Sequence, residues 1–163
     1  MRLASCLFLG IVALVASPVG EAPAAAVEVM ATAPIGGLDL LYDSTIWNVT
    51  SDERGTQVVC QAHDCRDVYL TITVADPEES PCTEALLTGY WGTDAATTVK
   101  ANALSFLVTT LDFGCRNLAG GPLYACTAHR DKTYFVAAPG DHCHTPWHHE
   151  DIVLGVLRGL RPR

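Results

Sequence analysis

Six of the seven cysteines in this 163-residue chain come after residue 26. An even set of cysteines in an exported chain predicts a framework of disulfide bonds, which limits the folds open to a small domain. Cys60 and Cys65 flank a short polar turn between two strand-like runs, so we expect a Cys60–Cys65 bond that closes a hairpin. Local pairing predicts two further bonds, Cys115–Cys126 and Cys82–Cys143.

The amino-terminal segment predicts export. Met1 and Arg2 give a positive start, residues 7–16 form a continuous apolar run, and Ala24–Ala26 supply small residues. This order is typical of a secretory signal peptide, which we expect to be cleaved after Ala26. The alternative is an uncleaved anchor, but a bilayer-spanning helix takes about 20 apolar residues. The expected location is the periplasm or the exterior, with no stable membrane insertion after cleavage.

The sequence divides into three parts. Residues 1–26 are interpreted as the signal peptide, residues 27–45 as an arm ordered only towards Leu38–Tyr42, and residues 46–163 as a single α+β domain. The net charge of −8 argues against nucleic-acid binding, because phosphate contacts need clustered Lys and Arg. The expected partner is therefore another exported protein or a small ligand.

Hydrophobic periodicity predicts five or six short strands. The clearest is 67–75, where Val68, Leu70 and Ile72 alternate with polar or aromatic residues, so that the aliphatic side chains share one face. The other expected strands are 46–50, 56–61, 103–111, 123–129 and 133–137.

The end of the chain changes to a helical period. Apolar residues recur there at helical spacing, at Ile152, Val153, Val156, Leu157 and Leu160. We expect Thr145 to cap this helix, with Pro146 in its first turn, and a second short helix to follow Ser80 and Pro81. The predicted fold is α+β and disulfide-stabilised: a small antiparallel sheet of about five or six strands with the C-terminal helix packed on one face.

Four of the six histidines lie within residues 142–149. Imidazole is a common ligand of zinc, copper and nickel, so His142, His144 and His148 are candidate metal ligands, with copper or zinc as the expected ion. The alternative is a polar helix start that faces solvent. A metal knuckle is a further alternative for Cys60, His63 and Cys65, but an oxidising compartment favours the disulfide.

Catalytic patterns are absent from the sequence. It contains no Gly-x-Ser-x-Gly elbow, and pairing of the six cysteines leaves no thiolate nucleophile. The favoured hypothesis is an exported, non-enzymatic binding or interaction domain. One alternative is a hydrolase with an unrecognised site, which predicts a pocket that gathers a histidine, a carboxylate and a hydroxyl. The other is a structural, envelope-associated protein, which predicts an exposed apolar patch around Tyr90 and Trp91.

Overall fold

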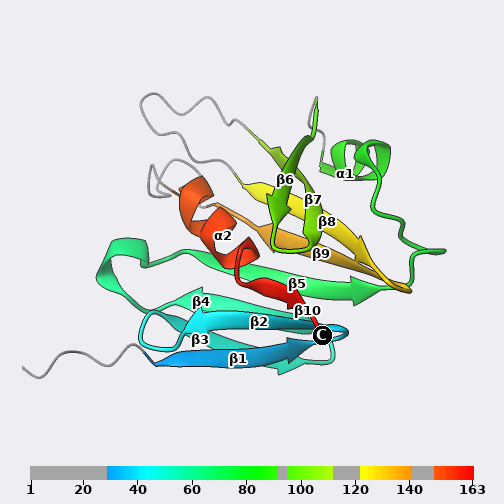
Figure 1. The fold of residues 1–163 in the computed structure, drawn as a ribbon. Helices are drawn as coiled ribbons and strands as arrows, with labels where there is room; N and C mark the ends of the chain where they lie inside the picture. The colour runs from blue at the N-terminus through cyan, green and yellow to red at the C-terminus, as the bar shows by residue number, and fades with distance from the viewer. Residues whose placement is uncertain (1–28, 92–94, 112–121, 141–148) are drawn as a thin grey trace, which may run out of the picture.

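The described part of the chain forms antiparallel strands and two short α-helices (Figure 1). The structure is a computed structural model, and it describes residues 29–91, 95–111, 122–140 and 149–163. The expected signal peptide lies outside the described residues, as do the side chains of Tyr90 and Trp91.

The larger sheet has seven strands in the described part of the chain, in the order β3-β4-β5-β9-β8-β7-β6. Every neighbouring pair is antiparallel. Its strands are β3 Trp47–Asp52, β4 Gly55–Cys60, β5 Tyr69–Ala75, β6 Thr97–Ala101, β7 Leu104–Thr110, β8 Leu123–His129 and β9 Lys132–Ala138. The predicted sheet of five or six strands was too small, because β6 occupies a segment whose short polar run gave no clear period.

A second, three-stranded sheet was not predicted. It has the order β1-β2-β10, formed by Met30–Ile35, Leu38–Asp43 and Leu160–Pro162. The interpretation of residues 27–45 as an arm was therefore wrong for residues 30–43, which form a hairpin with Ile35 opposite Leu38. Gly36 makes the tight turn at φ +61°, a conformation in which glycine has no Cβ penalty.

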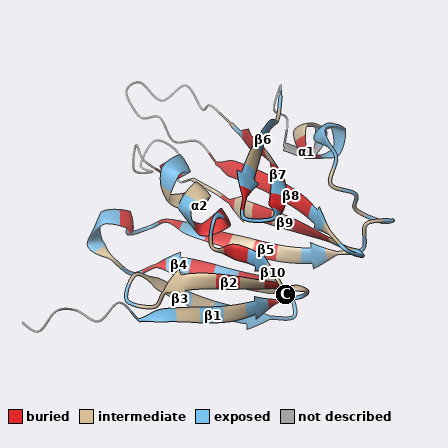
Figure 2. Cartoon of the chain, in the orientation of Figure 1, coloured by how far each residue is buried: buried red, intermediate tan, exposed pale blue. Residues whose placement is uncertain are grey.

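One face of the large sheet carries the main core (Figure 2). Side chains from β1 and β2, such as Ile35 and Leu40, join Leu70 and Phe106 of the large sheet in one buried cluster. Helix α2 (His149–Leu157) closes this core with its apolar stripe of Val153, Val156 and Leu157. The expected packing of the C-terminal helix on one face of a sheet is thus confirmed.

Helix α2 ends earlier than its apolar stripe predicted, because Leu160 belongs to β10. The end of the helix is held by Asn102, in the turn between β6 and β7. The side-chain nitrogen of Asn102 donates hydrogen bonds to the carbonyl oxygens of Arg158 and Leu160, each at 2.8 Å. These bonds hold the segment that leads from α2 into β10 against the β6–β7 turn of the large sheet.

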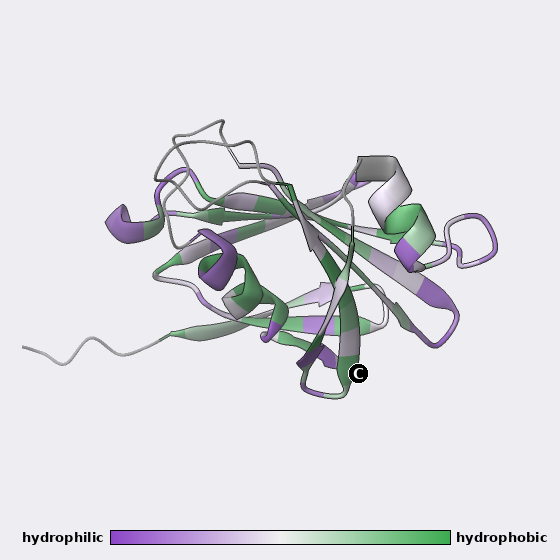
Figure 3. Ribbon diagram, turned by 90° about the horizontal axis from the view of Figure 1, so that it is seen from above, coloured by the Kyte–Doolittle hydropathy of each residue, from purple (hydrophilic) through white to green (hydrophobic). Residues whose placement is uncertain are grey.

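Helix α1 (Glu84–Trp91) lies on the opposite face of the large sheet (Figure 3). Its buried Leu87 packs in a small cluster with Tyr124 and Cys126 of β8. The hydroxyl of Thr83 accepts a hydrogen bond from the Leu86 amide, so the cap is Thr83 and not the expected Ser80. A disulfide between Cys82 and Cys126 ties the start of the helix to the sheet.

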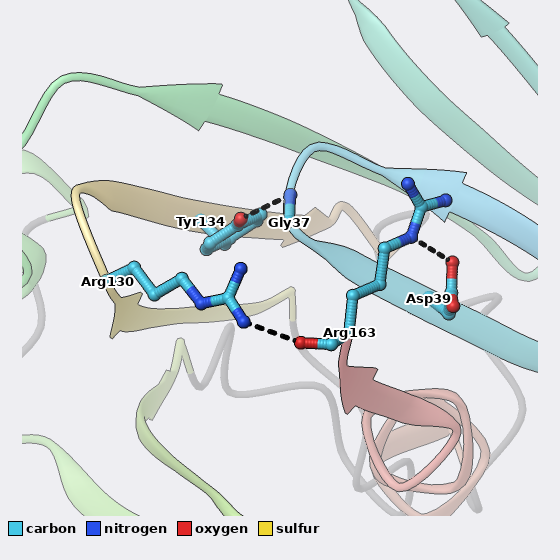
Figure 4. A network of polar contacts seen from close by, with 5 residues as sticks. All are labelled: Gly37, Asp39, Arg130, Tyr134 and Arg163. Carbon is cyan, nitrogen blue, oxygen red and sulfur yellow. Dashed lines mark hydrogen bonds and ion pairs between the residues drawn. The ribbon is translucent and has the colours of Figure 1, made fainter.

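Polar contacts join the two sheets where the chain ends (Figure 4). The hydroxyl of Tyr134 in β9 accepts a hydrogen bond from the Gly37 amide at 2.9 Å. Arg130 donates to the carbonyl oxygen of Arg163, whose own guanidinium contacts Asp39 of β2 at 2.6 Å. The network fixes the small sheet relative to the β8–β9 hairpin, and with it one wall of the groove described next.

Candidate functional site

A groove of about 490 Å³ opens between β2, helix α2 and the segment after β4. We call it the α2–β2 groove. Its apolar lining includes Leu40, Ile46, Trp47, Ile152 and Val156, and its charged lining consists of Asp43, Asp64 and Asp151. Because these residues come from three separate stretches of the sequence, only the folded chain brings them together.

The first wall depends on the turn between β2 and β3. One carboxylate oxygen of Asp43 accepts hydrogen bonds from the amide of Thr45 at 2.8 Å and from its hydroxyl at 2.6 Å. Such a turn, closed by an aspartate side chain, fixes the local backbone without further packing. It thereby directs the chain into Ile46 and Trp47, which line the groove.

The second wall is fixed by a covalent bond. Cys60 at the end of β4 is joined to Cys65, and the intervening chain forms the short 3₁₀ helix η1 (His63–Cys65). Cys65 is buried and Asp64 is exposed, so the bond anchors the helix while the carboxylate remains at the rim. The predicted Cys60–Cys65 bond is confirmed, and its hairpin clasp also shapes the groove.

The third wall is one face of α2. Asp151, Ile152, Gly155 and Val156 lie on it at helical spacing. A Cβ atom built on Gly155 would meet no heavy atom within 4 Å, so this glycine leaves an open notch. Glycine in a helix interior lowers stability by about 1 kcal/mol relative to alanine. Close packing therefore does not require a glycine at position 155.

The groove is acidic. Its described lining contains three carboxylates and no lysine, arginine or histidine. The hydrogen bond from the Thr45 hydroxyl, followed by that from the Thr45 amide, lowers the pKa of Asp43 below its usual value of 3.8. Asp43 is therefore ionised throughout the neutral and mildly acidic range.

A second cavity, of about 300 Å³, lies between α1 and the large sheet. Its lining is apolar apart from Thr71, Thr73 and Ser80. In the described residues, neither cavity gathers the histidine, carboxylate and hydroxyl that the hydrolase hypothesis predicted.

The other two predicted disulfides were wrong. Cys82 is bonded to Cys126, with their Cα atoms 5.6 Å apart, so neither Cys115–Cys126 nor Cys82–Cys143 can form. Cys126 lies on the face of β8 that α1 covers, and this places it beside Cys82. The two cysteines left over, Cys115 and Cys143, lie outside the described residues.

The candidate metal ligands His142, His144 and His148 also lie outside the described residues. Within the part of the chain that is described, no three His, Cys, Asp or Glu side chains lie close enough to hold a metal ion. The neighbouring His149 is described and is 1% exposed. Its Nε2 atom is 3.5 Å from the carbonyl oxygen of Ala138, and burial lowers the pKa of its imidazole.

Sequence reasoning did not identify the groove. Its carboxylates are far apart in the chain, and aspartate in a turn or at a helix start is common. The one local signal is Gly155, a glycine inside an otherwise regular apolar helix.

Neither a protein-family model nor a curated protein matches the sequence. In the described residues, no helix has the length and hydropathy needed to cross a membrane. Among solved structures, the chain is similar to the solution structure of cyanobacterial PsbP (CyanoP) from Synechocystis sp. PCC 6803, with a TM-score of 0.52 and 14% sequence identity. The match covers 90% of this chain and 100% of the cyanobacterial chain. At this identity the comparison establishes the fold.

Proposed function

We propose that this protein is an exported binding domain whose ligand site is the α2–β2 groove. The observation that carries the proposal is the groove itself, an apolar depression of about 490 Å³ with a few polar groups at its edge. Its volume falls in the range of about 300–1,000 Å³ that is typical of small-molecule sites.

Fixed walls support a binding role. The Cys60–Cys65 bond, the Asp43 turn and the two Asn102 hydrogen bonds each hold one side of the groove. A site formed in advance avoids much of the entropic cost of ordering side chains when a ligand binds.

The disulfides support export. Such bonds persist in oxidising compartments such as the periplasm and the exterior, and they are rare in the cytosol. Together with the predicted signal peptide, the bonds Cys60–Cys65 and Cys82–Cys126 favour a periplasmic or secreted protein.

Filling the notch at Gly155 tests the site. We expect Nile red, a neutral apolar dye, to bind the oxidised mature protein with an increase in fluorescence. Gly155→Leu should weaken this binding at least about tenfold, because the new side chain occupies the groove. Circular dichroism would show that the variant keeps its fold.

The matched control is Gly89→Leu. Gly89 also lies in a helix, and a Cβ atom built on it likewise meets nothing within 4 Å, but it lies outside the groove. Equal dye affinity in the native protein and the folded Gly155→Leu variant would rule out the α2–β2 groove as the site.

The metal hypothesis stays a prediction, separate from the groove. It expects equilibrium dialysis to show copper, zinc or nickel bound at micromolar concentrations. Replacement of His142, His144 and His148 by alanine should remove that binding. If the triple variant binds metal as well as the native protein does, the histidine cluster is not the site.

A further inference from the structure

Building on the proposed function, we infer that the ligand is a small organic cation whose apolar body fills the α2–β2 groove and whose positive group faces Asp43, Asp64 and Asp151. Charge complementarity selects this class. Three carboxylates line the groove, and its described lining contains no basic side chain.

The carboxylates are held by three different elements. Asp43 is the last residue of β2, Asp64 lies in η1, and Asp151 lies in the first turn of α2. Each element is fixed by its own contacts, so the three charges keep their places around one groove. All three carboxylates therefore belong to the lining of the same groove.

Each of the three carboxylates also interacts with its own surroundings. Thr45 hydrogen-bonds the Asp43 carboxylate, which keeps its charge. Nδ1 of the exposed His63 is 3.5 Å from Asp64 and lies outside the lining. The positive end of the α2 dipole offsets part of the charge of Asp151.

The apolar lining selects the rest of the ligand. Tyr42 and Trp47 add aromatic side chains to the aliphatic ones of α2 and β2. Aromatic faces attract organic cations through their quadrupole, and they bury an apolar ligand body at the same time. A metal ion or a small polar cation would not use this surface, whereas an arylalkyl ammonium ion would use both parts of it.

Three probes of similar shape separate charge from size. They are 1-naphthylmethylammonium, 1-naphthylmethanol and 1-naphthoate, each measured by displacement of Nile red from the oxidised mature protein. We expect the ammonium ion to bind about tenfold more tightly than the alcohol at low salt, and the carboxylate to bind most weakly. The preference should shrink towards 0.5 M salt, because ions screen exposed charges.

Isosteric variants assign the preference to the rim. Asp64→Asn combined with Asp151→Asn should reduce the ammonium-to-alcohol ratio to about twofold and leave the affinity for the alcohol unchanged. The control is Asp131→Asn, which removes a charge of the same sign from the exposed β8–β9 turn, outside the groove.

The outcomes separate the two proposals. Equal affinity for all three probes, with Nile red still sensitive to Gly155→Leu, overturns the cation inference and leaves the groove as a site. If Gly155→Leu binds Nile red as tightly as the native protein does, the proposed function is overturned.

Discussion

His149 begins α2 with its imidazole buried in the core. Its Nε2 atom faces the carbonyl oxygen of Ala138 at 3.5 Å, and its Nδ1 atom has no hydrogen-bond partner among the described residues. Burial away from water disfavours the charged imidazolium and lowers the pKa of this histidine below 6.5, while the contact with Ala138 raises it slightly. The residue thus links the stability of the domain to pH.

The sign of this pH dependence follows from the protonation of His149 in the folded and unfolded states. The unfolded chain takes up a proton near pH 6.5, whereas the folded protein does so only at lower pH. The free energy of unfolding should therefore be constant with respect to His149 above pH 6.5 and fall as the pH drops below it. Urea unfolding of the native protein and of His149→Phe at pH 7.5 and 5.5 measures the effect.

The variant should lose less stability between these pH values than the native protein does. His63→Ala is the control, because His63 is exposed in η1. The prediction is contradicted if the free energy of unfolding changes equally between pH 7.5 and 5.5 in the native protein and in His149→Phe.

At the scale of elements, the two glycines of the C-terminal segment have opposite surroundings. A Cβ atom on Gly155 meets nothing, whereas one on Gly159 would overlap the carbonyl oxygen of Leu41 in β2. Gly159 also accepts a hydrogen bond from the Leu41 amide at 3.0 Å. The close approach of these two backbones lets the chain pass from α2 into β10.

Alanine substitutions should therefore change stability in opposite directions. Gly155→Ala should raise the free energy of unfolding by about 0.5–1 kcal/mol, because alanine favours a helix over glycine. Gly159→Ala should lower it by about 1–3 kcal/mol through overpacking. Chemical denaturation measures both. If Gly159→Ala leaves the free energy of unfolding unchanged, β2 and the α2–β10 connection can move apart without loss of stability.

Local sequence patterns predicted the elements whose residues signal them strongly. The β8–β9 hairpin and the apolar stripe of α2 agree with the expected positions. The β1–β2 hairpin was missed because Pro34, Gly36 and Gly37 lie close together, and such a cluster also fits an irregular arm. Strand β10 was missed because three residues are too few to show a period.

At the scale of the whole molecule, the long-range pairings had no local signal. Strand β5 pairs with β9, and Thr71 lies opposite Ala137 although the two residues are far apart in the sequence. This pairing decides the order of the large sheet, and the order decides which cysteines meet. The Cys60–Cys65 bond could be predicted because five residues separate its ends, whereas Cys82–Cys126 depended on where α1 packs.

The same topology predicts the remaining disulfide. The two bonds present leave Cys115 and Cys143 without an assigned partner in the mature chain. The described strand residues nearest to them in the sequence meet at one end of the sheet, because Leu123 pairs with both Thr110 and Ala138. We expect a Cys115–Cys143 bond, detected by mass spectrometry of a non-reduced digest of the exported protein.

The digest carries its own control. The peptide that joins Cys82 to Cys126 should appear in the same sample and disappear on reduction. Free thiols at Cys115 and Cys143, with Cys82–Cys126 intact, would contradict the expected third bond.

The hold of Asn102 on the end of α2 exposes the protein to a slow chemical change. Deamidation replaces the amide nitrogen, which donates to both carbonyls, by a carboxylate oxygen that can only accept. Two attractive contacts then become two repulsive ones at the end of the helix that forms a wall of the groove. Ageing at this single side chain, one dalton heavier and one charge more negative, would loosen a site whose lining does not include it.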